Sequence, residues 1–217
     1  MAVNFFVFKF PGVSKARCAF QFRNLEEGEL SGNISFNVGD SEKKVLESRQ
    51  GLIAQLKGLD QWSECHQVHG TSIVKEPLPT EIVADKLPEA DGMMTSQKGL
   101  GLMLKTADCQ PLFIANKEGT CIMALHVGWR GNRAAFPQIA VKDFCAHYGV
   151  RPQNLVAVRG PSLGPAAAEF VNFDTDFGPE FSRWHDPETK RVNLWAMTRW
   201  QLQEAGVPQE NIFGDRD

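Results

Sequence analysis

The sequence lacks any run of about 18 apolar residues, so it predicts no membrane-spanning helix. It also lacks an excess of charge of one sign, because 23 basic and 26 acidic side chains leave a formal net charge of −3. A nucleic-acid-binding surface needs a basic face, so this balance argues against a nucleic-acid partner. The first residues show neither a basic segment nor a small-residue cleavage site, and we expect no signal peptide.

Cysteine is scarce and irregularly spaced. The five residues are Cys18, Cys65, Cys109, Cys121 and Cys145. An odd and scattered set does not suit a disulfide framework, so we expect a reduced, cytoplasmic protein. A chain of 217 residues with 42% hydrophobic side chains can bury a sizeable core without disulfides, and we expect a single domain over residues 1–217.

Apolar runs of strand length are mixed with helical patterns along the chain. Helices are predicted from Asp40 or Ser41 to Gly58, from Gly131 to His147, and from Asn193 to Gly206. Strands are predicted at 5–10, 18–22, 62–68, 72–75, 92–96, 101–106, 111–116, 120–126 and 155–158. Strands and helices do not alternate regularly, which favours an α+β fold with mixed sheets over a doubly wound parallel sheet.

Three short segments each place one metal-ligating side chain next to a small residue at the end of a predicted strand. They are Gln67-Val68-His69-Gly70, Thr106-Ala107-Asp108-Cys109-Gln110-Pro111 and Leu125-His126-Val127-Gly128-Trp129-Arg130-Gly131. His69, Cys109 and His126 form a donor set that suits Zn²⁺ with a fourth position open for water or substrate. They lie 40 and 17 residues apart, so they can meet only through the fold.

The same residues allow interpretations that need no metal. A lone cysteine is usually a buried apolar residue, and we expect Cys65 to be one. Cys109 and His126 could instead form a nucleophilic pair, in which the imidazole activates the thiolate. Arg130 and Trp129 would then bind an anionic or aromatic group.

A second motif competes with this site. Gly160-Pro161-Ser162-Leu163-Gly164 fits the nucleophile elbow of α/β-hydrolases, with His185 downstream as a partner. However, an elbow leads directly into a helix, and Pro165 follows here instead. A Gly- and Pro-rich loop is therefore the preferred interpretation.

The three segments also resemble a known family. Together with Ser35-Phe36-Asn37-Val38-Gly39, Ser48-Arg49, Ala90-Asp91-Gly92 and Gly160-Pro161-Ser162-Leu163-Gly164, they are similar in order to motifs of the YfiH-like family. That family is also labelled the multicopper polyphenol oxidase (laccase) family and, more recently, purine nucleoside phosphorylase. The resemblance implies a layered α/β/β/α domain with mixed β-sheets, and a Zn²⁺ site, with Cu²⁺ as the alternative, at His69, Cys109 and His126.

The resemblance further implies phosphorolysis of adenosine, inosine, guanosine and methylthioadenosine, and hydrolytic deamination of adenosine. The partners would then be purine nucleosides and phosphate. Asn37 and Arg49 are expected near the substrate, and Arg49, with Arg130 as a second candidate, is expected to orient phosphate through its planar donor fork. Asp108 and Gln67 are placed behind the ligands as orienting residues, although strand alternation points Asp108 away from the face of Cys109.

Departures from the family pattern leave other functions open. The family usually continues beyond Asp215-Arg216-Asp217, so we expect this chain to lack the family's C-terminal tail. The first alternative function is a cytoplasmic hydrolase that edits peptidoglycan precursors, a UDP-muramyl peptide amidase. Copper-dependent phenol oxidation is discounted, because five histidines are too few for several copper centres. A zinc-stabilised binding module without turnover is the last alternative, and the oligomeric state stays open.

Overall fold

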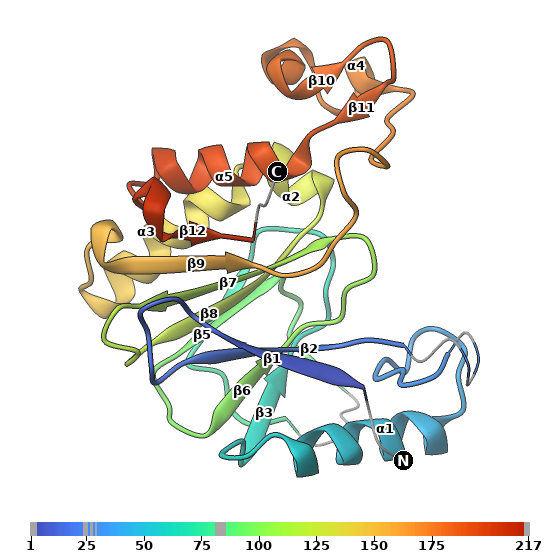
Figure 1. Ribbon diagram of the computed structural model, residues 1–217, viewed down its shortest axis with the longest axis vertical. Coiled ribbons are helices and arrows are strands. Elements are labelled where there is room, and N and C mark those ends of the chain that lie inside the picture. The colour runs from blue at the N-terminus through green and yellow to red at the C-terminus, as the bar shows by residue number, and fades with distance from the viewer. Residues whose placement is uncertain (1–3, 24–25, 27, 29, 81–85, 215–217) are drawn as a thin grey trace.

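A six-stranded mixed sheet lies at the centre of the computed structural model, which describes residues 4–23, 26, 28, 30–80 and 86–214 (Figure 1). The strand order is β12-β9-β7-β8-β5-β4. The strands are β4 (Ile73–Lys75), β5 (Gly92–Thr95), β7 (Gln110–Asn116), β8 (Ile122–Val127), β9 (Leu155–Arg159) and β12 (Ile212–Phe213). β4 runs parallel to β5 and β12 parallel to β9, whereas the other neighbours are antiparallel.

Helices cover one face of this sheet. They are α2 (Trp129–Arg133), α3 (Phe136–Tyr148) and α5 (Leu194–Glu204). The largest buried cluster lies between them and the sheet, where Phe136 and Phe144 of α3 and Leu202 of α5 join Leu112 and Leu125 of the strands. Burial of these apolar side chains is the main favourable term that holds the helices on the sheet.

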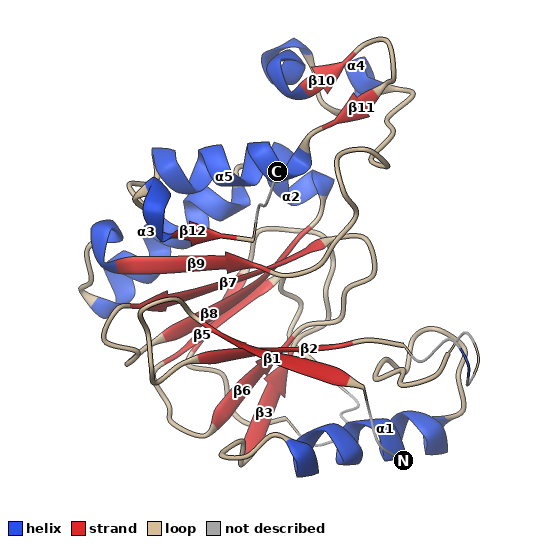
Figure 2. Cartoon of the chain, viewed as in Figure 1, coloured by secondary structure: helices blue, strands red, loops and turns tan. Residues whose placement is uncertain are grey.

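A second layer of strands covers the opposite face. The antiparallel hairpin of β1 (Phe5–Lys9) and β2 (Arg17–Gln21) packs Phe8 and Cys18 against Val156 and Val158 of β9. β3 (Gln61–Glu64) and β6 (Leu100–Met103) form a parallel pair, and α1 (Glu42–Gln55) packs Leu52 against Trp62 of β3. Figure 2 shows the resulting order of helices, sheet, second strand layer and α1. The predicted layered α/β/β/α domain with mixed sheets is confirmed.

The segment before α5 projects from the layers at the top of Figure 1. It contains α4 (Phe173–Asp176) and the small hairpin of β10 (His185–Asp186) and β11 (Arg191–Val192). Three 3₁₀ helices complete the described elements, at Pro152–Asn154, Pro179–Trp184 and Gln209–Asn211. Within the described residues, no helix combines the length and apolarity needed to cross a membrane.

Several predicted elements differ from the structure in extent; the strand predicted at 101–106, for example, ends at Met103. The strand predicted at 62–68 ends at Glu64, because residues 68–70 turn away as a loop in which His69 has a φ of 60°. The helix predicted from Gly131 to His147 is two helices, α2 and α3. Ala135 between them has a φ of 55°, and Pro137 in the first turn of α3 cannot donate a helical hydrogen bond.

Helix capping agrees with the sequence at one end of the chain more than at the other. Asn193 caps α5, and its side-chain oxygen accepts a hydrogen bond of 2.9 Å from the backbone nitrogen of Ala196, as predicted. Ser41 occupies the N-cap position of α1 without a side-chain capping bond. The expectation about the C-terminal end of the chain concerns residues 215–217, which lie outside the described residues.

Candidate metal centre

One end of the central sheet collects the chemically active side chains. β7 begins there directly after Cys109, and β8 ends there with His126 next to its last residue. The two strands are antiparallel, and Pro111 pairs with His126 in register. β4 and β5 both start at the same edge, because Ile73 pairs with Gly92 and Gly92 with Leu125. The loop that carries His69 leads into β4. The sheet therefore brings the three predicted ligands together at one end of its strands.

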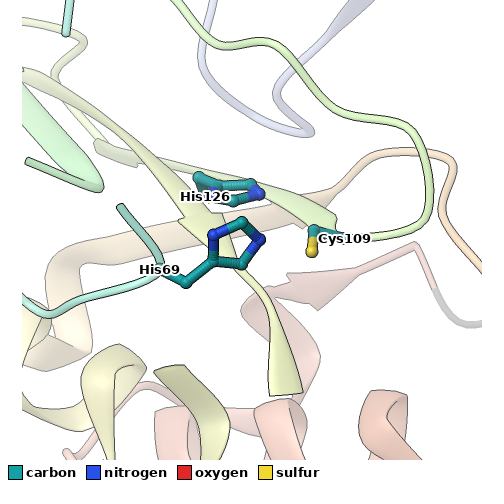
Figure 3. Close-up of side chains that lie close together, drawn as sticks. All are labelled: His69, Cys109 and His126. Carbon is teal, nitrogen blue, oxygen red and sulfur yellow. The ribbon is translucent and has the colours of Figure 1, made fainter. Parts of the chain in front are cut away.

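The three ligand side chains converge (Figure 3). One ligand atom from each of His69, Cys109 and His126 lies within 4.8 Å of the other two. The two imidazole rings are 4.8 Å apart at their centroids and inclined at 73°. His69 is exposed, Cys109 is half-buried and His126 is buried, so the group opens to solvent on the side of His69. We call these three residues the metal trio.

Gly128 provides the space in which the metal trio meets. A Cβ atom at this position would lie 3.0 Å from Cys109 Sγ and 3.1 Å from His69 Cδ2. Such contacts are tighter than ordinary van der Waals packing, so a larger residue would push the ligands apart. The glycine between His126 and Trp129 is therefore required by a close approach and not by a backbone angle.

Asp91, at the start of β5, is buried behind the trio with no exposed surface. Its Oδ1 lies 2.8 Å from His126 Nδ1. Because a carboxylate only accepts hydrogen bonds, Nδ1 carries the proton and Nε2 of His126 remains as the ligand atom. Ala90-Asp91-Gly92 is one of the family-like motifs, but no role was predicted for Asp91. An acidic residue directly before a buried strand was the signal that could have identified it.

Electrostatics differ between the two histidines. Burial lowers the pKa of His126, but hydrogen bonds with Asp91 and Cys109 outweigh burial and raise that pKa to about 9. Burial and the nearby charge of His126 lower the pKa of His69, so this ring is neutral near pH 7. Burial raises the pKa of Asp91, but hydrogen bonds from His126 and from the backbone of Gly70 and His69 reverse the effect and lower it.

Gln67 ties together two of the segments that carry ligands. Its Nε2 donates to the carbonyl of Lys105 at 2.8 Å, and its Oε1 accepts from the Lys105 nitrogen at 2.9 Å. This pair of bonds fixes the loop of His69 to the segment that leads to Cys109. The geometry is compatible with the orienting role predicted for Gln67, which stays a prediction.

Arg49 lies elsewhere, on α1, and reaches Glu64 of the second strand layer. Its guanidinium is 1% exposed and binds both carboxylate oxygens of Glu64, at 2.7 and 3.1 Å. Its Nε donates to the carbonyl of Ile34 at 2.8 Å, and Lys105 Nζ lies 3.2 Å from the same carboxylate. A substrate could reach this guanidinium only by displacing these partners. Substrate binding by Arg49 therefore stays a prediction that the geometry does not favour.

The other predicted site residues are all exposed. Arg130 is exposed on α2, with its guanidinium 4.2 Å from the centre of the Trp129 ring, and its charge helps to lower the pKa of His69. Asn37 is exposed next to Phe36, whose ring lies 4.4 Å from the Arg49 guanidinium. Asp108 is also exposed, and its backbone carbonyl accepts a hydrogen bond from Leu163. The roles proposed for these residues stay predictions.

The packing decides the interpretation of Cys65 and of the Ser162 segment. Cys65 is fully buried with Ala90 and Met93, as expected for a packing residue. The nucleophile-elbow interpretation is wrong, because no helix follows Gly164 and Ser162 Oγ accepts hydrogen bonds from Arg159 and Trp195. The proposed partner His185 stacks on Phe173 with 3.9 Å between the ring centres.

The metal trio has the chemistry of a metal site. Zn²⁺ binds thiolate and imidazole at about 2.3 and 2.0–2.1 Å, so its ligand atoms lie roughly 3.5 Å apart. The three ligand atoms lie within 4.8 Å of one another, so they would move closer together on binding an ion. A buried carboxylate on the far nitrogen of a ligating histidine is the usual support of such sites. The trio therefore could hold a metal ion, with a fourth position left open.

Comparison with known proteins shows one family match and several sequence relatives. Residues 6–217 match the family model described as multi-copper polyphenol oxidoreductase laccase. A Xylella fastidiosa protein named purine nucleoside phosphorylase is 33% identical over 94% of this chain and 77% of its own length. The Escherichia coli protein named purine nucleoside phosphorylase YfiH is 32% identical over 84% of this chain and 73% of its own.

Solved structures agree with the sequence relatives. The crystal structure of YlmD from Geobacillus stearothermophilus superposes with a TM-score of 0.72 at 26% identity, covering 86% of this chain and 74% of that one. A Neisseria meningitidis protein superposes with a TM-score of 0.79 over 98% of this chain and 87% of its own, at 24% identity, and so supports the fold alone. The chain belongs to the YfiH family, whose model is described as multi-copper polyphenol oxidoreductase laccase.

Proposed function

We propose that this chain is a zinc-dependent purine nucleoside enzyme. It would split adenosine, inosine, guanosine and methylthioadenosine with phosphate, and would deaminate adenosine with water. The observation that carries the proposal is the metal trio, assembled at one sheet edge in a chain whose relatives are named purine nucleoside phosphorylases. Cu²⁺ is the alternative ion for the same donors.

The ligand inventory argues against a multicopper oxidase. Among the described residues, the metal trio is the one group of at least three close His, Cys, Asp or Glu side chains that could hold an ion. None of the other three histidines joins the trio: His66 is exposed, His147 contacts Tyr148 and His185 stacks on Phe173. Oxidation of phenols through several copper centres would need further histidine-rich sites.

The proposed reactions have simple bond balances. In phosphorolysis, the bond between ribose C1′ and the purine nitrogen breaks and a bond between C1′ and a phosphate oxygen forms, while the purine leaves with the electron pair and takes up a proton. In deamination, a water oxygen bonds to C6 and ammonia leaves. A bound Zn²⁺ supplies Lewis acidity, which polarises an oxygen and lowers the pKa of water towards about 7.

The chain's own residues would bind and orient the reactants. The exposed guanidinium of Arg130, held against Trp129 on the side of His69, offers a planar donor fork for phosphate. His126 keeps its Nδ1 proton on Asp91, which fixes the direction of Nε2. The half-buried Cys109 would supply a sulfur ligand to a bound cation.

Metal analysis of the purified protein, combined with chromatography of adenosine incubated with and without phosphate, tests the proposal. We expect about one Zn²⁺ per chain, adenine released only with phosphate, and inosine formed without it. Stoichiometric zinc without nucleoside turnover would overturn the enzymatic proposal and favour the cell-wall hydrolase. Turnover that persists without metal would favour the Cys109–His126 nucleophilic pair instead.

A further inference from the structure

The Asp91 carboxylate accepts hydrogen bonds from four donors. Its Oδ1 accepts from His126 Nδ1 at 2.8 Å and from the backbone nitrogen of His69 at 3.0 Å. Its Oδ2 accepts from the backbone nitrogens of Gly70 at 2.5 Å and Val68 at 3.3 Å. One buried side chain therefore contacts the segments of two different ligands, which lie 57 residues apart in sequence.

The loop that Asp91 holds is conformationally unfavourable without it. His69 has a φ of 60°, a left-handed conformation that costs a non-glycine residue about 1 kcal/mol or more. Three consecutive amides of this loop point at one carboxylate, which compensates for that conformation with charge-assisted hydrogen bonds. The exposed ring of His69 is thereby placed 4.8 Å from that of His126.

We propose that Asp91 is a positioning residue that sets two of the three metal ligands at once, His126 through its side chain and His69 through its backbone. The inference rests on the proposed function in one respect, because it takes the metal trio to bind an ion. It goes beyond that function because it assigns the geometry of the site to a residue that touches neither metal nor substrate.

Asp91→Asn is the substitution that tests this positioning role most directly. We call the four hydrogen bonds to the Asp91 carboxylate the Asp91 clamp. An amide has one acceptor oxygen, whereas both carboxylate oxygens of Asp91 accept from fixed donors. The NH₂ group of the asparagine must therefore face two hydrogen-bond donors, either those of His126 and His69 or those of Gly70 and Val68. Either choice releases at least one ligand segment while the size of the side chain stays the same.

Glu76→Gln is the matched control. Glu76 follows β4, and its carboxylate also accepts several hydrogen bonds, from Thr95, Ser96 and Tyr148. It lies at the other end of β5 from Asp91, since Thr95 is the last residue of that strand. The control removes the charge of a similarly bonded carboxylate without touching the metal trio.

The measurement uses Co²⁺ as the probe, titrated into metal-free protein in competition with a chelator. We expect the Co²⁺ dissociation constant of Asp91→Asn to rise about 10- to 100-fold, the usual effect of losing a partner of a metal ligand. We also expect the visible Co²⁺ absorption of a tetrahedral site to change in shape, which a loss of stability alone would not cause. Glu76→Gln should match the unaltered protein in both readouts. An Asp91→Asn protein with unchanged affinity and spectrum would overturn the proposal.

Amide hydrogen exchange on the unaltered, metal-free protein keeps the test decisive if Asp91→Asn fails to fold. The amides of Val68, His69 and Gly70 should exchange as slowly as those of β5, although they lie in a loop. Fast exchange at these three amides would overturn the clamp. If the unaltered protein binds no Co²⁺, the proposed metal site fails, whereas slow exchange would still support the clamp on the loop.

Discussion

Two clusters of charged side chains lie in different layers of this molecule, and they differ in what their polar atoms face. In the metal trio and Asp91, the inner atoms are hydrogen-bonded, while His69 is exposed to solvent. In the cluster of Arg49, Glu64 and Lys105, the guanidinium and carboxylate are enclosed, with side-chain exposures of 1% and 2%. An incoming ligand can reach the first cluster directly. Reaching the second requires breaking protein contacts, so the first suits binding and the second suits stability.

Cys109→Ala has the largest expected effect and would break the first cluster. The variant removes the thiolate, so we expect it to lose stoichiometric Zn²⁺ and both nucleoside activities. Metal content and the adenosine assay measure this directly. Cys145→Ala on α3 is the control, because that cysteine is half-buried and packs on the large core cluster, and it should keep both properties. Activity in metal-free Cys109→Ala would show that the trio does not carry the reaction.

Glu64→Gln would break the second cluster. It leaves the buried guanidinium of Arg49 without its bidentate partner, which typically costs about 3–5 kcal/mol of unfolding free energy. Urea denaturation measures this loss, and the protein that remains folded should keep its metal. Arg49→Met is the companion change and should also destabilise. If Arg49→Met instead abolished activity at unchanged stability, Arg49 would be a substrate ligand, as the family resemblance implies.

Arg130→Ala tests whether the solvent-exposed side of the metal trio binds phosphate. Loss of a charge-assisted contact of about 1.5–3 kcal/mol should raise the KM for phosphate roughly 10- to 100-fold. Deamination with water should change much less, because that reaction needs no phosphate. Arg133→Ala, an exposed change on the same helix, is the control. Equal losses in both reactions would argue against phosphate binding by Arg130.

Gly128→Ala should have a smaller effect, limited to the spacing of the ligands. The added methyl group would press on Cys109 Sγ and His69 Cδ2, and we expect Zn²⁺ affinity to fall about tenfold, near the lower limit for disturbed ligand partners. Gly131→Ala on α2 is the control, since its nearest contact would be an ordinary 3.5 Å from Phe136. Equal affinities of the two variants would show that the trio tolerates the added methyl.

The smallest expected effect is a dependence of stability on pH from Glu76. Burial raises the pKa of this carboxyl, but hydrogen bonds from Tyr148, Ser96 and Thr95 together outweigh burial and lower the pKa overall. A pKa that is lower in the folded state contributes stability above the unfolded value, and this stability is lost as the pH falls through the folded value. Because Glu76 is exposed, Glu76→Gln should cost below about 1 kcal/mol at pH 7 and nothing at low pH. Urea denaturation at both pH values tests this.

The sequence predicted more of the ligands than of their support. His69, Cys109 and His126 stand out by residue type, and the apolar strands that bring them together are recognisable by length. Asp91 was missed because its importance depends on four contacts, three with residues 68–70 and one with His126, and all of these residues are distant from it in sequence. The break between α2 and α3 was not predicted, because nothing in the sequence indicates that Ala135 adopts a left-handed conformation. Pro137 was the one residue that pointed to a helix start there.

Arg49 shows a different limit of sequence reasoning. The position was singled out through its resemblance to a family motif, yet its charge is matched inside the protein by Glu64. Sequence alone does not reveal that the two residues, on α1 and β3, meet in the second layer. A charged residue in a motif indicates that the charge is needed, and only its surroundings show whether a ligand or the fold needs it.

The pairing of Pro111 with His126 makes the proposed metal site depend on the register of β7 and β8. If β7 slipped along β8 by one residue, His126 and the start of β7 after Cys109 would no longer face the same side of the sheet. Only the correctly paired sheet presents all three ligands together. Because an ion that binds the folded chain alone shifts the equilibrium towards it by mass action, metal would select this register and stabilise it.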